Sequence, residues 1–470
     1  MKKETIILGA GESGIGAALL AQRLGQRVFV SDAGQPQDHF LAELREAGIA
    51  YEAGGHDEAR ILRAEIIIKS PGIPDTVQLM QDAKVAGIEV ISEIEFAFRY
   101  CPEAATIIGI TGSNGKTTTT MLTHHLLATA GLDARMGGNI GTSFARMLLD
   151  EAVNEHTIFV LELSSFQLDG IASFHPDMAT VLNITPDHLD RYGYQLSRYA
   201  DSKLSIAKNQ GKDDLLLVYH NDNTVQEAID RTNLSVEATA ITEDQINLDK
   251  LLISKDQSFD LSTTKLKGNH NALNALFAIR IAQALNVKRE AIQAGLNSFE
   301  PAAHRMEEVA EHKGVIYIND SKATNVDATF YALDAMTGPT VWIAGGTDKG
   351  NDYTPVFRLA QEKVHTLICL GLDNGKLINS FKELVPTIYE TQSAADAVAK
   401  AREVAQPGDT VLLSPACASF DLFRNYIDRG DQFRASVKSW LPEYTPPGGA
   451  AGGGQLATLK SKNPNNQPES

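Results

Sequence analysis

The sequence predicts an α/β protein with largely parallel sheets, because short apolar runs alternate with helical patterns along almost the whole chain. Two of these runs lead straight into glycine-containing turns, near residues 9–14 and 112–115, that are followed by helical patterns. The length of 470 residues is enough for about three domains. We predict domains over residues 1–93, 94–300 and 301–445, and a disordered tail over residues 446–470.

Composition indicates a soluble globular protein with 43% hydrophobic and 21% charged residues. A net charge of −17 argues against a broad surface for nucleic acid or for an anionic membrane. The cysteines Cys101, Cys369 and Cys417 are too few for a disulfide framework and indicate a reducing compartment. There is no signal-peptide pattern and no apolar run near the ~20 residues of a membrane helix, so we expect a cytoplasmic protein.

The most informative segment is an apolar strand at residues 107–110 that continues into a turn and the run Gly115-Lys116-Thr117-Thr118. Backbone N–H groups in such a turn surround a phosphate, and the following helix adds its positive end. Lys116 is expected to reach the β- and γ-phosphates, and Thr117 to bind Mg²⁺. The usual P-loop has a glycine where this chain has Ile110, which leaves a plain strand–turn–helix as the alternative.

The first segment has a second phosphate-binding pattern, Gly9-x-Gly11-x-x-Gly14, between an apolar strand and a helix. The next strand ends at Asp32, about 20 positions further on, as in the Rossmann dinucleotide fingerprint. We expect a diphosphate over the turn and Asp32 near a sugar or base. The alternative is a Rossmann-like scaffold that binds no dinucleotide.

Polar residues follow two strands of the second segment. Glu162 ends the strand over residues 157–161, beside the predicted phosphate loop, where a Mg²⁺ ligand would lie. A solvent-facing Glu162 is the alternative. The strand over residues 179–184 ends in a loop with His188 and several charged residues, at the sheet edge where α/β proteins bind ligands. The third segment repeats a doubly wound pattern, with strand ends at residues 320, 345, 371 and 414.

Two nucleotide-type sites on separate α/β domains favour an enzyme that joins or transfers groups with ATP. The phosphate loop at 111–117, together with the segments at 162–168, 183–191, 268–271 and 304–305, resembles the Mur ligases, which build the peptide stem of peptidoglycan. Segments 319–325 and 414–421 resemble the family member that adds D-glutamate. The Asp-Asn-Pro-Arg motif of the neighbouring diamino-acid-adding member is not found in the sequence.

The resemblance implies the three-domain Mur ligase architecture: a Rossmann-like N-terminal domain for the UDP substrate, a P-loop-type central ATP domain and a Rossmann-like C-terminal domain for the amino acid. It implies that the carboxylate of UDP-MurNAc-L-Ala attacks the γ-phosphate of ATP, giving an acyl phosphate and ADP. The amine of D-glutamate then attacks and phosphate leaves. Two Mg²⁺ ions and small-molecule substrates are implied, and we expect a monomer.

The resemblance also assigns site residues, which fall into groups by ligand. The catalytic group is Lys116, His188, Lys203 and Arg305. ATP is expected on Gly112, Ser113, Asn114, Gly115, Lys116, Thr117, Thr118, Asn271, Arg305, Asp320 and Lys322. The UDP substrate is expected on Gly11, Glu12, Ser13, Asp32, Ser70, Gly72 and Asn139, and D-glutamate on Thr324, Lys349, Ser419 and Tyr426. The metal ligands are Thr117, Glu162, His188 and Lys203.

Lys203 is assigned by the resemblance alone. It matches the family's carbamylated lysine, whose amine becomes an anionic oxygen ligand for Mg²⁺. Without the family, Lys203 reads as a surface lysine on a helix.

Two departures from the family's pattern affect the substrate sites. Residues 33–36 lack the hydroxyl and basic groups that related enzymes often place against the uridine, so those contacts are not assigned. Tyr426 replaces a common phenylalanine, which matters little if the contact is through backbone.

Two other functions stay open. A related amide ligase such as a folylpolyglutamate synthase would share Lys116, Glu162, His188 and Lys203, but not the N-terminal glycine unit or the 320–325 motif. A nucleotide sensor without catalysis would keep the folds but has no reason to keep the catalytic side chains.

Overall fold

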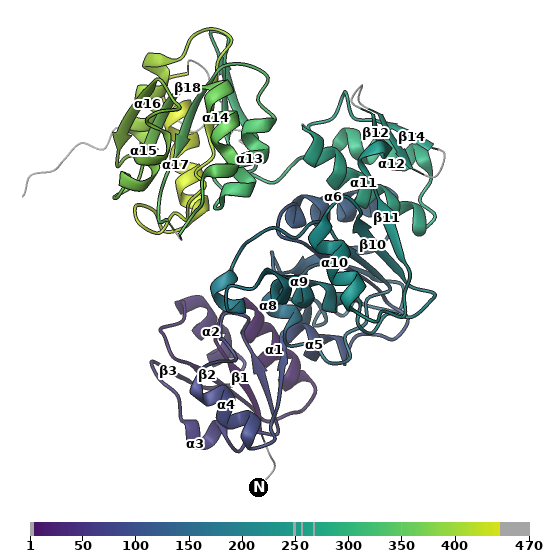
Figure 1. The fold of residues 1–470 in the computed structure, drawn as a ribbon. Helices are drawn as coiled ribbons and strands as arrows, with labels where there is room; N and C mark the ends of the chain where they lie inside the picture. The colour runs from purple at the N-terminus through teal and green to yellow at the C-terminus, as the bar shows by residue number, and fades with distance from the viewer. Residues whose placement is uncertain (1–3, 248–250, 255–256, 267, 349, 442–470) are drawn as a thin grey trace, which may run out of the picture.

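The computed structural model describes residues 4–247, 251–254, 257–266, 268–348 and 350–441. Figure 1 shows three α/β bodies that follow one another along the chain, coloured purple, teal, and green to yellow. Their main sheets lie within residues 5–92, 106–241 and 307–413, which confirms an α/β fold with mostly parallel strands. The boundaries at 93/94 and 300/301 stay predictions, and the predicted tail over residues 446–470 lies outside the described residues.

The N-terminal body is a five-stranded parallel sheet in the order β3-β2-β1-β4-β5. Its strands are β1 (Thr5–Leu8), β2 (Val28–Asp32), β3 (Ala50–Ala53), β4 (Ile66–Lys69) and β5 (Glu89–Ser92). Its helices are α1 (Glu12–Arg23), α2 (Asp38–Glu46), α3 (Glu58–Ile61), α4 (Gln78–Val85) and α5 (Glu93–Phe98). The three inner strands β2, β1 and β4 are mostly buried, as expected for a sheet covered by helices on both sides, whereas the edge strands β3 and β5 are partly exposed.

The central body is a six-stranded parallel sheet in the order β11-β10-β9-β6-β8-β7. Its strands are β6 (Thr106–Thr111), β7 (Ala134–Gly138), β8 (Ile158–Glu162), β9 (Met178–Val181), β10 (Leu215–Tyr219) and β11 (Ala238–Ile241). The helices are α6 (Lys116–Thr129), α7 (Phe144–Met147), α8 (Ser165–Leu168), α9 (Leu196–Leu204), α10 (Asn223–Arg231), α11 (Asn269–Ala284) and α12 (Arg289–Ser298). Short 3₁₀ turns are η1 (Leu189–Tyr192), η2 (Ser205–Ala207) and η3 (Glu243–Gln245).

Antiparallel strands occur in two places that the sequence did not reveal. A three-stranded sheet of β12 (Ile246–Asn247), β13 (Leu251–Ser254) and β14 (Gln257–Asp260) lies beside the central body. The C-terminal sheet has the order β15-β16-β20-β17-β18-β19, and its edge strand β15 is antiparallel to β16. The other neighbours in that sheet are parallel.

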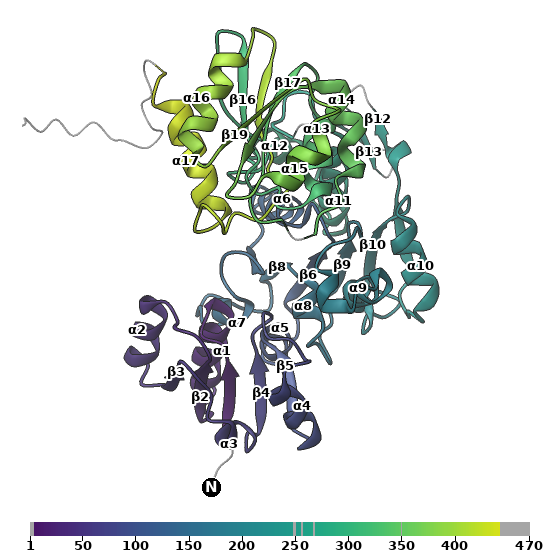
Figure 2. The same cartoon turned by 60° about the vertical axis from the view of Figure 1, so that its left-hand side comes forward.

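The C-terminal body has helices on both faces of its sheet (Figure 2). Its strands are β15 (Glu307–His312), β16 (Val315–Asn319), β17 (Thr340–Ala344), β18 (Val364–Leu370), β19 (Thr387–Thr391) and β20 (Thr410–Leu413). Its helices are α13 (Val326–Asp334), α14 (Phe357–Lys363), α15 (Gly375–Phe381), α16 (Ala394–Val404) and α17 (Tyr426–Lys438), with a 3₁₀ turn η4 (Thr354–Val356).

The apolar cores show how the three bodies are joined. One continuous buried cluster runs from the N-terminal sheet, through Ile7 and Ile94, to the central sheet at Phe159 and Val181. The two clusters of the C-terminal sheet contain only C-terminal residues among those that the structure describes. The N-terminal and central bodies therefore share a core, whereas the C-terminal body meets the central one through other contacts.

Candidate active site between the central and C-terminal domains

The turn between β6 and α6 is the phosphate loop predicted from the sequence. Gly112 and Gly115 have φ of 153° and 85°, in the region that favours glycine. A Cβ on Gly115 would also lie 2.4 Å from Oδ1 of Asn274, so α11 packs directly on the loop. The helix α6 begins at Lys116, and its first-turn N–H groups point back toward the loop.

The loop after β9 shapes the phosphate loop. The Ser113 N–H donates to the Asn183 carbonyl at 2.8 Å, and the Asn114 N–H donates to Oδ1 of Asn183 at 2.8 Å. The Asn183 side-chain amide returns a bond to the Asn114 carbonyl at 3.0 Å. Asn183 thus holds the loop from the neighbouring strand, a role that we did not predict.

Two buried lysines meet at one carbonyl of this loop. Nζ of Lys116 donates to the Gly112 and Ser113 carbonyls at 2.7 and 2.8 Å, and Nζ of Lys203 donates to the Gly112 carbonyl at 2.8 Å. Burial, followed by the charge of Lys116, lowers the pKa of Lys203 well below its ordinary value. Burial likewise lowers the pKa of Lys116. With 1% exposure, Lys203 is not the surface lysine that its helix pattern indicates.

Glu162 offers a carboxylate oxygen to this group of cations. It ends β8 in register with Ile110 of β6, so its side chain starts beside the phosphate loop. Oε1 accepts a bond from the Asn139 side chain at 2.9 Å, whereas buried Oε2 has no hydrogen-bond partner. Burying a carboxylate oxygen without a partner is costly, so this oxygen is suited to bind a cation.

His188 lies on the loop after β9, in a left-handed conformation with φ of 52°. Its Nε2 is 3.5 Å from Oδ2 of Asp187, and its ring centroid is 5.1 Å from that of Phe166. Half of the side chain is exposed, so the ring can reach a ligand. No cluster of three His, Cys, Asp or Glu side chains with metal-binding geometry occurs among the described residues.

A cavity of about 400 Å³ opens beside the loop, between the central and C-terminal bodies. Four predicted ATP residues line it, namely Asn114, Gly115, Arg305 and Asp320. The other lining residues are Asn183, Tyr219, Glu243, Ile246, Asn269, His270, Leu273, Asn274, Met306, Ala328, Tyr331 and Ala332. Burial lowers the pKa of His270 to about 4, helped by Arg305, so this ring is neutral at neutral pH.

The C-terminal body sends charged residues to the same place. Nζ of Lys322 donates to Oγ1 of Thr117 at 2.7 Å, which joins two residues 205 positions apart. Burial, followed by Arg305, lowers the pKa of Lys322 to about 8. Burial raises the pKa of Asp320 to about 7, opposed by Arg305. Nε of Arg305 is buried without a hydrogen-bond partner.

The remaining predicted ATP residues lie at the same loop or on the helix that packs on it. Thr118 is buried in the first turn of α6. Asn271, in the first turn of α11, is buried, and its Oδ1 lies 3.4 Å from the Asn274 amide.

Three of the residues predicted for D-glutamate lie beside this site, Thr324 and Ser419 on loops and Tyr426 at the first residue of α17. The backbone carbonyl of Tyr426 accepts a bond from the Ser321 hydroxyl at 2.7 Å, and Ser419 is buried with its carbonyl accepting from Phe423. The Thr324 N–H donates to the Lys322 carbonyl at 2.9 Å. Lys349 lies outside the described residues.

Arg429 holds these loops together and was missed by sequence reasoning. Its guanidinium is 1% exposed and donates to the Ser321 hydroxyl and carbonyl at 3.0 and 2.8 Å, and to the Cys417 carbonyl at 3.2 Å. A buried arginine bonded to carbonyls in place of a carboxylate ties several loops at once.

A second cavity of about 610 Å³ lies at the carboxyl edge of the N-terminal sheet. It is lined by Gly11, Asp32, Ser70 and Gly72 of the predicted UDP-binding group. Oδ2 of Asp32 accepts a bond from the Ala10 N–H at 2.7 Å, which closes the glycine turn.

Three predicted UDP-binding residues do not line this cavity: Glu12, Ser13 and Asn139. Oε1 of Glu12 accepts bonds from the Ser143 N–H and from Nε of Arg146 at 3.0 and 2.8 Å. Glu12 therefore joins the N-terminal body to the central one. Asn139 turns toward Glu162.

Comparison with known proteins identifies the family of this arrangement. Family models for the MurD-like N-terminal domain, the Mur ligase middle domain and the Mur ligase glutamate ligase domain match residues 3–92, 110–282 and 304–417. A UDP-N-acetylmuramoylalanine--D-glutamate ligase from Christiangramia forsetii is 45% identical, over 93% of this chain and 100% of its own. One from Porphyromonas gingivalis is 46% identical, over 93% and 99%. The chain belongs to the Mur ligase family.

Solved structures agree with this Mur ligase in architecture. MurC from Thermotoga maritima superposes with a TM-score of 0.57 at 18% identity, covering 93% of this chain and 100% of that one. MurF from Acinetobacter baumannii gives a TM-score of 0.58 at 18% identity, covering 88% and 90%. The three-domain fold expected from the sequence is thereby confirmed. No helix in the described part of this Mur ligase is long and apolar enough to cross a membrane.

Proposed function

We propose that the chain is an ATP-dependent ligase that adds D-glutamate to UDP-N-acetylmuramoyl-L-alanine and releases ADP and phosphate. One observation carries the proposal: relatives 40–46% identical over 93% of the chain bear the name of that ligase. The cations and carboxylate between the two domains supply the chemistry that the reaction needs.

The reaction brings several anions together, so its barrier is largely electrostatic. The substrate carboxylate attacks the γ-phosphorus as the bond to ADP breaks. The D-glutamate nitrogen, having lost a proton, then attacks the acyl carbon and phosphate leaves. Arg305 lines the cavity, while Lys116 and Lys322 contact Gly112 and Thr117 at the phosphate loop, and we assign all three to the phosphates.

Mg²⁺ fits the residues on the central side. The unpartnered Oε2 of Glu162 and the hydroxyl of Thr117 are hard oxygen donors, and His188 is close enough to the solvent to serve a second ion. We propose two Mg²⁺ ions held by these residues and Lys203. The ions would neutralise the phosphate charge that develops during transfer.

Lys203 suits carbamylation because burial lowers the pKa of its amine, which favours the neutral form. A neutral amine adds its nitrogen to the carbon of CO₂ and loses one proton, which converts a would-be cation into an oxygen ligand. Carboxylates Asp187, Asp169 and Glu162 lie near enough to Lys203 to oppose the lowering of its pKa. A Mg²⁺ ion between carbamate and carboxylates would relieve that concentration of negative charge.

We assign the UDP group to the N-terminal cavity and D-glutamate to the loops tied by Arg429. Gly11, Asp32, Ser70 and Gly72 line the first of these sites. The second is built from Thr324, Ser419 and the Tyr426 backbone, with Lys349 assigned from the sequence alone. We further propose that the enzyme acts in the cytoplasm as a monomer on these small molecules.

The experiment is ADP release by the full chain with ATP, Mg²⁺ and UDP-MurNAc-L-Ala, comparing D-glutamate with L-glutamate, D-aspartate, lysine and diaminopimelate. Release that depends on D-glutamate, with an amide product of the expected mass, supports the proposal. Release with another amino acid keeps the ligase chemistry and overturns the acceptor. No release with any of them overturns the proposal. The alternatives are then the folate-type ligase, which shares the fold, and a nucleotide sensor.

A further inference from the structure

The linker between the central and C-terminal domains has an unusual backbone around Arg305. Its neighbours on both sides, His304 and Met306, have φ of 63° and 47°, in the left-handed region. A residue other than glycine is strained in that region and persists there only where its surroundings hold it. Arg305 itself lines the nucleotide cavity, with its buried Nε unpartnered.

His304 is fixed through its backbone and its ring. Its N–H donates to Oε2 of Glu307 at 2.9 Å, and its carbonyl accepts from the Lys322 N–H at 3.0 Å. The ring is 5% exposed, with Nδ1 3.0 Å from the Asn319 side-chain nitrogen. A Cβ on Gly430 would lie 2.2 Å from Nδ1, so α17 packs against the ring without space between them.

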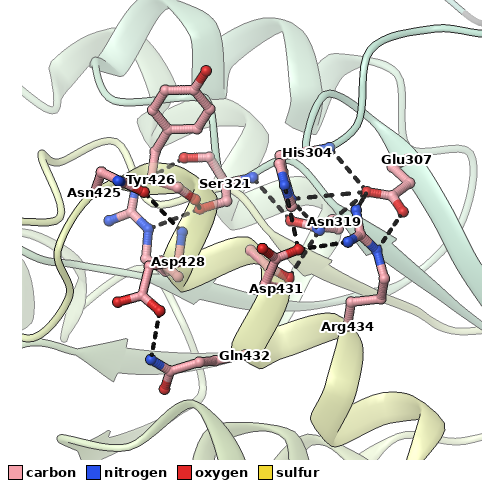
Figure 3. Close-up of polar contacts among 12 residues, drawn as sticks. His304, Glu307, Asn319, Ser321, Asn425, Tyr426, Asp428, Asp431, Gln432 and Arg434 are labelled. Carbon is pink, nitrogen blue, oxygen red and sulfur yellow. Dashed lines mark hydrogen bonds and ion pairs between the residues drawn. The ribbon is translucent and has the colours of Figure 1, made fainter. Parts of the chain in front are cut away.

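Arg434 of α17 holds Glu307 in place with a two-pronged contact. Nε and Nη2 of Arg434 donate to Oε1 and Oε2 of Glu307, each at 2.8 Å, and Nη1 donates to Asp431 at 2.6 Å (Figure 3). Burial favours the neutral form of Glu307, but the bonds from Arg434 and from the His304 N–H outweigh it and lower its pKa. Arg434 therefore favours the ionised form of the carboxylate that accepts the His304 N–H.

We propose that Glu307 and Arg434 are positioning residues for Arg305. Together they fix the left-handed turn at His304, and this turn aims the Arg305 guanidinium at the phosphates of the nucleotide. The inference rests on the proposed function, because it takes the ligand of the cavity to be ATP. Neither residue belongs to a motif identified in the sequence, and neither lines the cavity.

The test is a double-mutant cycle on nucleotide affinity in the full chain, measured by calorimetry with a non-hydrolysable ATP analogue and Mg²⁺. Arg434→Met removes the bidentate contact with Glu307. Arg305→Met removes the side chain through which Arg434 is proposed to act. We expect Arg434→Met to weaken binding about tenfold in the wild-type background and less than twofold in the Arg305→Met background. Arg434→Lys keeps one of the two hydrogen bonds to Glu307 and should recover part of the affinity that Arg434→Met loses.

Controls separate positioning from general stability. Arg358→Met removes an exposed arginine that pairs with Glu362 on α14 of the same domain, and it should leave the affinity unchanged. If Arg434→Met does not fold, Glu307→Gln is run through the same cycle with the same expectation.

Each outcome has a distinct meaning. A fall in melting temperature with unchanged affinity would mean that the pair is only structural and overturns the inference. Equal losses in both backgrounds also overturn it, because Arg434 would then act independently of Arg305. If the wild-type protein binds no ATP analogue, the proposed function itself fails.

Discussion

At the scale of single residues, the candidate active site is defined by lysine side chains that the fold keeps away from water. Lys116 and Lys203 share the Gly112 carbonyl, and Lys322 reaches the hydroxyl of Thr117 from another domain. Burial lowers the pKa of each of these amines. An anion near these amines would favour their charged forms, so a nucleotide phosphate, or a carbamate on Lys203, suits the site.

The lowered pKa of the Lys203 amine leads to a spectroscopic prediction. With ¹³C-labelled bicarbonate and Mg²⁺, the protein should show a carbamate carbon signal, because the uncharged amine adds CO₂. Lys203→Arg should abolish this signal and lower ligase activity at least a hundredfold. Lys208→Arg is the matched control, since Lys208 lies on the turn after the same helix and burial also lowers its pKa. A signal that survives in Lys203→Arg would contradict the assignment.

The unpartnered oxygen of Glu162 leads to a prediction about metal dependence. Glu162→Gln keeps the size of the side chain and an acceptor for Asn139 but removes the charge that attracts Mg²⁺. The Mg²⁺ concentration for half-maximal activity should rise about tenfold or more, as expected when one carboxylate ligand loses its charge. A Mg²⁺ titration at saturating ATP measures this, with exposed Glu155→Gln as the control. Coincident titration curves for Glu162→Gln and wild type would exclude Glu162 as a ligand.

Local sequence is enough to identify a site residue when its chemistry resides in neighbouring positions. Lys116 and Thr117 follow a strand and a glycine turn, so their role could be predicted directly. Lys203 is different, because its burial comes from the Gly112 loop, 91 residues earlier. Arg429 acts on Ser321, 108 residues away, and its segment gives no sign of that. Contacts at such separations are set by the assembled fold.

At the scale of elements, the predicted strands were right where both faces of a sheet are buried. The apolar runs of β1, β6 and β8 match such strands closely. The edge strand β15 is only partly buried and has two apolar residues, Val309 and Ala310, among four polar ones, so it lacked that signal. The helix α7 illustrates a further limit of prediction from sequence. The N–H groups at its N-terminus donate to Glu12 and Glu93, which belong to the N-terminal domain.

Glu93 gives the junction of α5 and α7 a pH dependence. Burial raises the pKa of Glu93 from 4.5 to about 8, although the Ala145 N–H donates to it. Between these values the folded protein keeps a proton that the unfolded chain releases, so raising the pH favours unfolding. The Glu93→Gln variant has no proton to release in this pH range. Its free energy of unfolding, relative to that of wild type, should therefore rise by up to about 1 kcal/mol for each unit by which the pH is raised.

Urea midpoints at pH 6, 7 and 8 measure this difference. Exposed Glu103→Gln, close to the same junction in sequence, should follow the wild-type curve in parallel. A parallel curve for Glu93→Gln as well would show that the carboxyl is ionised in the folded protein at these pH values.

At the scale of the whole molecule, the cores divide the chain into two parts. The N-terminal and central domains share one apolar cluster and are further joined by Glu12 and Glu93. The C-terminal domain meets the central one through polar contacts such as Lys322 with Thr117, and through the rings of His270 and Tyr331. Polar contacts around a ligand cavity separate more readily than a shared core.

We therefore expect the C-terminal domain to close as a rigid unit when ligands fill the cavity, turning about residues 299–303, which precede the turn fixed at His304. Anions between Lys116 and Arg305 would draw the two domains together, since each brings positive charge to the same phosphates. Small-angle scattering with an ATP analogue and the UDP substrate should show the radius of gyration falling by about 1 Å. Lys116→Met, with weakened phosphate binding, should show no fall at the same concentrations. Scattering that does not change in wild type, or that requires the N-terminal domain to move separately from the central one, would contradict this division, because the shared core allows motion only at the polar boundary.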